Sequence, residues 1–168
     1  RTVAIVQCRL GMRLAGVVVE LRPITLRMVD RRYLNWFSDP DITRFIANRP
    51  KDLAEARQYA REKLLDKNCR FFSIYALGVR VGTLKLDRDK TDPEDWWLGV
   101  MIAEAVWRGC GIGPRALWLG CLYAFDRLRA RKVYAGIDHA NKASVRAFEK
   151  AGFRFTHDPE RIVAWKTP

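Results

Sequence analysis

Trp107-Arg108-Gly109-Cys110-Gly111-Ile112-Gly113-Pro114 lies between an apolar, strand-like run at 96–103 and a long apolar, helix-like run that follows it. Three glycines within five residues let the backbone curl with its N–H groups pointing inward, and glycine has no Cβ to keep a ligand away. Pro114 suits the first turn of a helix, whose free N–H groups and positive dipole end face the loop. Arg108 adds a full charge. The stretch predicts a cradle for a pyrophosphate; the alternative is a plain glycine turn that caps a helix.

Two well-known glycine-rich loops differ from this one. A Walker loop ends in Gly-Lys-Ser/Thr, whereas this loop ends in Gly113-Pro114-Arg115. A dinucleotide-binding loop reads Gly-x-Gly-x-x-Gly. The spacing here is Arg-x-x-Gly-x-Gly, with Arg108, Gly111 and Gly113 at the defined positions, and it resembles the acetyl-CoA loop of the GNAT superfamily of N-acetyltransferases.

A second stretch, Asn141 to Phe153, strengthens this resemblance. It reads Asn-Lys-Ala-Ser-Val-Arg-Ala-Phe-Glu-Lys-Ala-Gly-Phe and resembles the GNAT motif in which Asn and Ser precede an aromatic residue, Glu-Lys and Gly-Phe. Asn141 and Ser144 are one turn apart on one helix face, although Asn141 also suits an N-cap and Ser144 a capping or packing role. The resemblance implies acetyl-CoA as co-substrate, bound by Val100, Met101, Ile102, Arg108, Gly109, Cys110, Gly111, Ile112, Gly113, Asn141 and Ser144.

Catalytic roles are assigned by the same resemblance and by chemistry. Many relatives place a tyrosine at the position of Phe148 to protonate the departing thiolate, which phenylalanine cannot do. Relatives similar to the RimJ and RimL ribosomal-protein acetyltransferases place a serine where Ser144 stands, so Ser144 is expected to take this role. The usual glutamate base is replaced by Trp97, which leaves Glu94, Asp95 and His139 as candidate bases. The alternatives are a water relay and, for His139, a solvent-exposed loop position.

The acceptor is indicated by the segment 33–45, which contains a tryptophan and an Asp-Pro pair. It resembles RimJ/RimL-like proteins and the GNAT enzymes of bacterial surface-polysaccharide and nonulosonic-acid pathways. We expect an amino-sugar nucleotide as acceptor, contacted by Tyr33, Trp36 and Arg49, with core packing as the alternative for the two aromatic residues. Two other functions stay open: acetylation of protein N-termini, and a CoA-binding module with weak catalysis.

The apolar periodicity predicts an α+β protein, in which helices cover both faces of a mostly antiparallel central sheet. This is the element order of the GNAT fold. The expected helices are 25–37, 42–46, 53–65, a long one from 114, and 141–151; the expected strands are 17–23, 71–76, 79–86, 96–103, 132–138, 153–155 and 162–165. Residues 1–16 are expected to add a strand and a loop to a single domain at 17–168.

Composition limits the partners. The 168 residues carry a net charge of +12, which favours anionic ligands. The basic residues are spread along the chain, so small phosphorylated ligands are preferred over nucleic acid. No apolar run is long enough for a membrane span. Four scattered cysteines and two histidines do not form a metal-binding pattern. We expect a cytoplasmic enzyme without a metal, acting on a small-molecule amine, with a homodimer left open.

Overall fold

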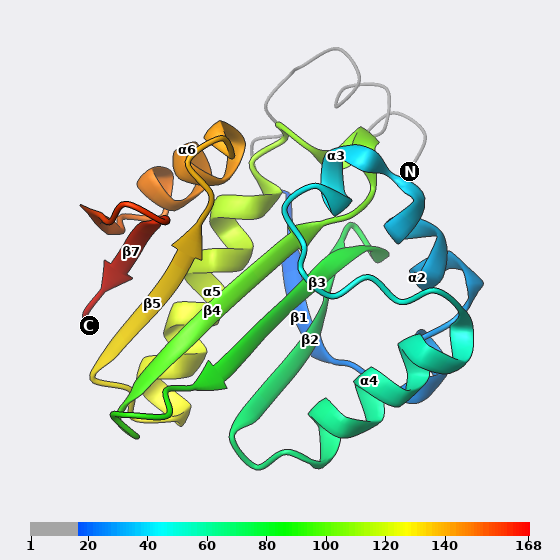
Figure 1. Cartoon of the computed structure of the whole chain (residues 1–168), viewed down its shortest axis with the longest axis horizontal. Coiled ribbons are helices and arrows are strands. Elements are labelled where there is room, and N and C mark those ends of the chain that lie inside the picture. The colour runs from blue at the N-terminus through cyan, green and yellow to red at the C-terminus, as the bar shows by residue number, and fades with distance from the viewer. Residues whose placement is uncertain (1–16) are drawn as a thin grey trace.

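The computed structural model describes residues 17–168, so the strand and loop expected at 1–16 lie outside the described residues. Seven strands form one sheet in the order β1-β2-β3-β4-β5-β7-β6 (Figure 1). Every neighbouring pair is antiparallel except β4 and β5. The strands are β1 Val19–Pro23, β2 Cys69–Ala76, β3 Val79–Arg88, β4 Asp95–Ile102, β5 Lys132–Ile137, β6 Arg154–His157 and β7 Ile162–Lys166.

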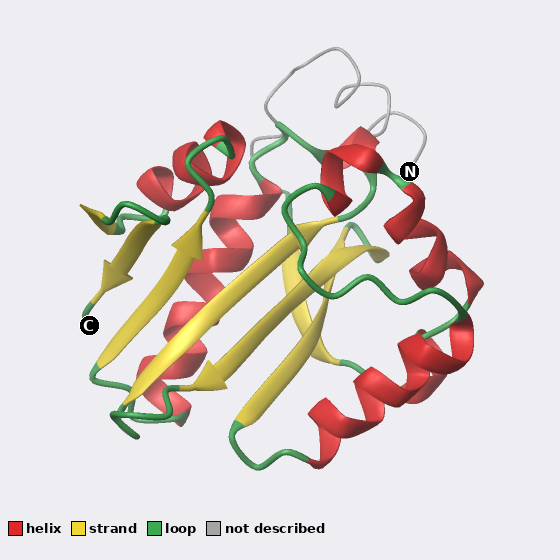
Figure 2. Ribbon diagram, viewed as in Figure 1, coloured by secondary structure: helices red, strands yellow, loops and turns green. Residues whose placement is uncertain are grey.

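Helices lie on both faces of this sheet (Figure 2). The helix that follows the glycine loop packs one face through Ala116 and Leu117 against Leu84 and Leu86 of β3. The opposite face carries a second apolar cluster, in which Ala56 and Ala60 lie near Phe71 of β2. The helical elements are η1 Leu26–Met28, α2 Arg31–Asn35, η2 Trp36–Ser38, α3 Pro40–Thr43, α4 Leu53–Leu65, η3 Ala105–Trp107, α5 Ile112–Arg127 and α6 Lys142–Lys150. The predicted fold class, α+β with a mostly antiparallel sheet, is confirmed.

The parallel contact between β4 and β5 is short. The two strands pair only at Asp95, Trp96 and Trp97 of β4, which face Lys132 to Tyr134 of β5. Beyond Trp97 the strands diverge toward the end of the sheet where α6 lies (Figure 1). Within residues 17–168, the edge of β4 from Leu98 to Ile102 therefore has no strand partner on its β5 side, although β3 pairs with its other side.

Close approach between β3 and β4 depends on Gly82. A Cβ at this position would lie 1.9 Å from the carbonyl oxygen of Met101, closer than any side chain can come. Gly82 thus lets β3 support β4 at the residues where β4 has lost its other neighbour.

The helix expected over 25–37 is broken in the structure. Residues 26–28 form one 3-10 turn, Val29 leaves the helical conformation, and Asp30 starts α2 by accepting a hydrogen bond from the Tyr33 N–H at 2.9 Å. The turn predicted at 42–46 is also displaced, because Asp39 caps a helix that begins at Pro40. Apolar periodicity continues through these breaks, since both pieces bury the same face.

Candidate active site

A cleft of about 1420 Å³ opens where β4 and β5 diverge. Its walls come from both faces of the sheet. On one side lie the glycine loop and the start of α6. On the other side lie α2, α4 and the residues Thr83 and Lys85 of β3. The two diverging strands also line it, through Leu98, Gly99, Val100, Met101 and Ile102 of β4 and Gly136 and Ile137 of β5. The cleft thus passes through the gap in the sheet.

The glycine loop has the backbone conformation that the sequence requires. Gly109 and Gly111 have φ angles of 78° and 82°, in the left-handed region that favours glycine. Within residues 17–168, their N–H groups have no hydrogen-bond partner, and the first turn of α5 contains no acidic residue. Gly111, Gly113 and Pro114 line the cleft. Free N–H groups at a helix start fit a pyrophosphate.

Arg108 lines the cleft, but its guanidinium is engaged by protein groups. It donates to the carbonyl oxygens of Ile102 and Ala103 at 3.0 and 2.9 Å and lies 2.6 Å from a carboxylate oxygen of Asp39. Arg108 therefore joins the end of β4 to the start of α3. The positive charge of Arg108, which the Arg-x-x-Gly-x-Gly spacing predicts to face a phosphate, is compensated by Asp39.

Another source of positive charge was missed in the sequence. Lys142, Arg146 and Lys150 are spaced four residues apart on α6, and all three line the cleft. This spacing puts side chains on one helix face. The sequence signal for it is the four-residue spacing of these basic residues within the stretch from Asn141 to Phe153.

Asn141 and Ser144 lie together at the start of α6. The Asn141 side chain accepts a hydrogen bond from the Ser144 N–H at 3.0 Å, so Asn141 is the N-cap. The Ser144 hydroxyl makes no hydrogen bond to another described residue, and Ser144 lines the cleft. Phe148, one turn later, is buried edge-on against Phe153 with ring centroids 4.8 Å apart. Of these side chains, only Ser144 and Asn141 offer a polar group to the cleft.

None of the three candidate bases lines the cleft, and Asp95 is buried, 3.3 Å from Arg131. Glu94 precedes the paired end of β4 and lies 3.7 Å from Arg131, roughly 20 Å along the strand from Val100 at about 3.3 Å per residue. The His139 ring hydrogen-bonds the carbonyl oxygen of Asp158 at 3.0 Å and does not line the cleft. The sequence predicts that these residues lie near the site, because it does not show at which end β4 separates from β5.

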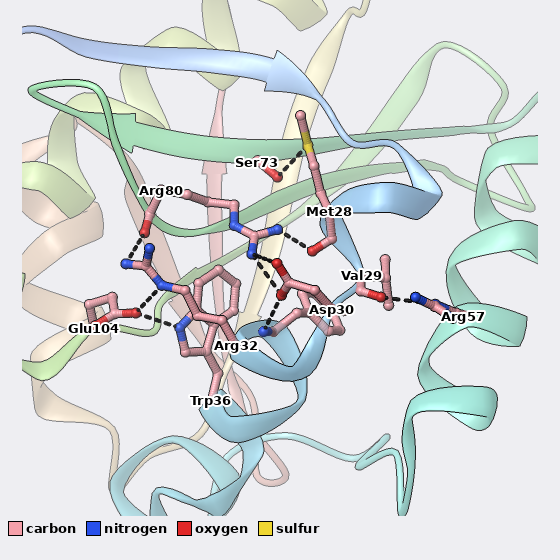
Figure 3. A network of polar contacts seen from close by, with 10 residues as sticks. Met28, Val29, Asp30, Arg32, Trp36, Arg57, Ser73, Arg80 and Glu104 are labelled. Carbon is pink, nitrogen blue, oxygen red and sulfur yellow. Dashed lines mark hydrogen bonds and ion pairs between the residues drawn. The ribbon is translucent and has the colours of Figure 1, made fainter.

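The three residues expected to contact an acceptor have different positions. Tyr33 and Arg49 line the cleft, whereas Trp36 does not. The Trp36 indole donates to Glu104 at 2.8 Å, and Glu104 also binds Arg32 (Figure 3). Trp36 is 5% exposed and belongs to the core, which was the alternative considered for it.

The same network encloses a buried arginine. The Arg80 guanidinium, 8% exposed, binds both carboxylate oxygens of Asp30 at 2.9 Å and the carbonyl oxygen of Met28 (Figure 3). It also lies over the Trp36 ring, 5.2 Å from the centroid. This network fixes α2 on β3 and so positions Tyr33 at the cleft.

A polar chain at the base of the cleft was not predicted. The Lys85 ammonium donates to the Tyr59 hydroxyl oxygen at 3.0 Å and lies 2.8 Å from Asp87. Burial opposes the charge on Lys85, but the hydrogen bonds with Asp87 and Tyr59 outweigh it and raise the pKa of Lys85. Burial, with the charge of Tyr59, raises the pKa of Tyr33 to about 12. This part of the cleft therefore holds the ammonium of Lys85 and the neutral phenol of Tyr33.

No cluster of potential metal ligands occurs within residues 17–168. In the same range, no helix combines the length and hydropathy required to cross a bilayer. The open edge of β4, the N–H groups of Gly109 and Gly111 and the basic face of α6 have the chemistry that acetyl-CoA requires.

Comparison with known proteins agrees with this assignment. The model of the acetyltransferase (GNAT) domain matches residues 19–154. Human alpha/beta-tubulin-N-acetyltransferase 9 is 33% identical over 156 residues, covering 83% of this chain and 74% of that protein. The N-acetyltransferase 9-like protein of Nematostella vectensis is 27% identical, with coverages of 83% and 76%.

Solved structures show the same fold. Aminoglycoside acetyltransferase AAC(6')-Ib with coenzyme A and kanamycin has a TM-score of 0.77 at 21% identity, covering 89% of this chain and 95% of its own. Spermidine N-acetyltransferase from Vibrio cholerae with CoA and spermine has a TM-score of 0.76 at 15% identity, with the same coverages. The chain belongs to the acetyltransferase (GNAT) domain family. It is an acetyl-CoA-dependent N-acetyltransferase that acts on amines.

Proposed function

We propose that this enzyme acetylates the amino terminus of a protein. The observation that carries the proposal is the 33% identity to a tubulin N-acetyltransferase across most of the chain. The cleft supports it, because the cleft continues from the β4 edge across the face covered by α2 and α4. An extended peptide can enter there with its amine toward Val100.

The residues of the cleft suggest a course for the reaction. Acetyl-CoA supplies an activated acetyl group, and the acceptor nitrogen forms a bond to its carbonyl carbon while the carbon–sulfur bond breaks. The backbone at Val100 and Met101 positions and polarises the carbonyl, and Ser144 donates a proton to the departing sulfur. Water in the cleft takes the proton of the amine, since Glu94, Asp95 and His139 lie outside it. Alignment in the cleft contributes about 7 kcal/mol or more.

An amino-sugar nucleotide is the second candidate acceptor. Tyr33 and Arg49 favour it, because both line the cleft and can contact a ring and a phosphate. Trp36, the third residue assigned to this acceptor, lies in the core instead. The protein acceptor is therefore preferred. The cytoplasmic location and the homodimer expected from the sequence stay predictions.

Thiol release from acetyl-CoA, combined with mass spectrometry of the acceptor, tests the proposal. The acceptors are peptides with free amino termini, the same peptides with blocked termini and one lysine, and 4-amino-sugar nucleotides. We expect acetylation at free termini. Acetylation of the sugar nucleotides alone would establish the second candidate. CoA binding without turnover of any acceptor would indicate the binding module, for which the loss of a tyrosine at Phe148 is the motivation.

A further inference from the structure

Three side chains with hydrogen-bond donors line the part of the cleft between α2, α4 and β3. Tyr33 comes from α2, Tyr59 from α4 and Lys85 from β3, and all three line the cleft. Tyr33 and Tyr59 belong to the same apolar cluster. Lys85 faces Phe71 of β2 in the sheet, and the Tyr59 ring packs edge-on against Phe71.

The hydrogen bonds fix which atoms are available to a ligand. Lysine has no acceptor, so the Tyr59 oxygen accepts from Lys85 and its own proton points elsewhere. Lys85 uses one N–H on Tyr59 and one on Asp87, which leaves the third. Tyr33 is only 3% exposed, yet its hydroxyl makes no hydrogen bond to another described residue. The group therefore presents donors to the cleft.

Two ammonium groups lie directly beside these donors and share one carboxylate. Lys63 lies 3.4 Å and Lys85 2.8 Å from Asp87. Asp87 does not line the cleft, whereas Lys85 does. Glu55 and Glu62 also line it from α4, but both are exposed and accept hydrogen bonds from the Lys51 N–H and Gln58. Lys63, Lys85 and Asp87 together carry one excess positive charge, which can compensate the charge of one ligand carboxylate.

The location connects these donors to the reaction. Lys85 pairs across the ladder with Gly99, which has no side chain and lines the cleft next to Val100. The ammonium is therefore uncovered on the side of the open β4 edge. A group bound here lies beside the place where the amine must meet the acetyl carbon.

We propose that Tyr33, Tyr59 and Lys85 form a subsite for a carboxylate of the acceptor, so that the enzyme selects amines with an acidic side chain close by. This inference rests on the proposed function and specifies it: the preferred peptides carry Asp or Glu within their first two residues. A carboxylate accepts several hydrogen bonds at once, and bonds to charged groups are the stronger ones. A phosphate dianion fits less well, because the subsite has no arginine and Asp87 lies directly behind it.

Matched peptides test the subsite through kcat/KM. Each pair differs only by Glu against Gln, or Asp against Asn, at residue one or two. Wild-type enzyme should prefer the acid by about tenfold or more. Lys85→Met should abolish the preference, and Tyr59→Phe, which retains the lysine, should reduce it. Lys90→Met, at an exposed lysine outside the cleft, should retain it. Equal rates for acid and amide, or a preference that survives Lys85→Met, would overturn the subsite.

A binding experiment separates this inference from the proposed function. Calorimetry with CoA present compares N-acetylglutamate α-amide with N-acetylglutamine α-amide, which differ only in the side-chain carboxylate, resemble the product and need no turnover. Binding of the acid alone, lost in Lys85→Met, supports the subsite even if no peptide is acetylated. Equal binding of both, or Lys85-dependent binding of uridine diphosphate without a preference for the acid, counts against it. Acetylation of peptides without a preference for the acid would retain the function and remove the subsite.

Discussion

A carboxylate oxygen of Asp39 lies 2.6 Å from the guanidinium of Arg108, although 69 residues separate them. Asp39 also caps α3 by accepting from the Asp41 N–H. The arginine recognised in the cofactor loop thus links that loop to the segment between α2 and α4. One side of the cleft is tied to the other by this pair.

Loss of this pair should affect stability more than the affinity for CoA. Arg108→Met removes the contact with Asp39 and two hydrogen bonds to carbonyl groups. Both partners are partly exposed, so we expect a loss of about 1 to 2 kcal/mol in the free energy of unfolding. Urea denaturation measures it, and calorimetry measures CoA binding. A CoA affinity more than about tenfold weaker, in a folded variant, would instead show that Arg108 contacts the phosphates.

Asp30→Asn should destabilise the protein because it leaves the buried Arg80 without its carboxylate. We expect a loss of about 2 kcal/mol, below the usual range for a buried pair because the Asp30 side chain is 46% exposed. Thermal and urea unfolding measure this loss, with Asp41→Asn as the exposed control. An effect equal to that of the control would mean that the pair contributes nothing to stability.

The Asp30 carboxylate also gives a pH dependence. Burial opposes its charge, but the Tyr33 N–H and Arg80 outweigh that effect, and the pKa of Asp30 is lowered. A carboxylate with a lowered pKa in the folded state stabilises it fully above the unfolded value of about 3.9, and the stabilisation is lost as the pH falls through the folded pKa. Wild type and Asp30→Asn should therefore differ above about pH 4 and converge in stronger acid. A difference that does not change with pH would contradict this.

Two glycine substitutions should separate folding from phosphate binding. Gly111 has a positive φ, so Gly111→Ala should cost about 1 kcal/mol of stability as well as CoA affinity. A Cβ at Gly113 would meet Ala147 and Ile102 at 3.7 and 3.9 Å, which is ordinary contact. Gly113→Ala should therefore retain stability and weaken only CoA binding. Unchanged CoA affinity in Gly113→Ala would remove the pyrophosphate from this part of the loop.

Ser144→Ala should lower turnover without changing the affinity for CoA. Proton donation by a positioned side chain contributes about 100-fold or more, so we expect a loss of that order in kcat. Asn141 accepts from the Ser144 backbone N–H, which the substitution retains, and α6 should remain capped. Single-turnover measurements exclude a slow product release. Unchanged kcat would assign the proton to water.

The basic face of α6 should contribute to CoA binding in a salt-dependent manner. Arg146→Gln and Lys150→Gln remove positive charges that line the cleft. The affinity for CoA should fall about threefold to tenfold for the pair at low salt, and the difference should shrink at high salt because these side chains are exposed. Lys67→Gln, on an exposed turn away from the cleft, is the control. Equal affinities at low salt would exclude this contact.

Local sequence patterns predicted most of the sheet and the left-handed backbone conformation of the glycine loop. The loop is determined by glycines whose conformations no other residue adopts readily, and the Asn141 to Phe153 stretch is similarly local. The pairings of Asp30 with Arg80 and Asp39 with Arg108 span 50 and 69 residues. Hydrophobic periodicity contains no information about such pairs, so the break at Val29 and the engagement of Arg108 were missed.

The acceptor side was harder to predict for the same reason. Tyr59 and Lys85 each fit an ordinary amphipathic helix and an ordinary strand, and only their contact makes them a site. Trp36 was predicted to contact the acceptor because it lies in a motif, but its side chain packs in the core. The position of Glu94 depended on which end of β4 separates from β5, and the residues of β4 alone do not determine that end.

Because β4 and β5 pair over only three residues, the stability of the folded protein should depend on the concentration of acetyl-CoA. Within residues 17–168, β4 and β5 each have an edge inside the sheet that no strand pairs with, and unpaired edges are templates for association with other chains. A ligand that binds only the folded state adds about 2.7 kcal/mol of stability at a concentration one hundred times its Kd. The lifetime and solubility of this enzyme in a cell should therefore rise and fall with the supply of acetyl-CoA.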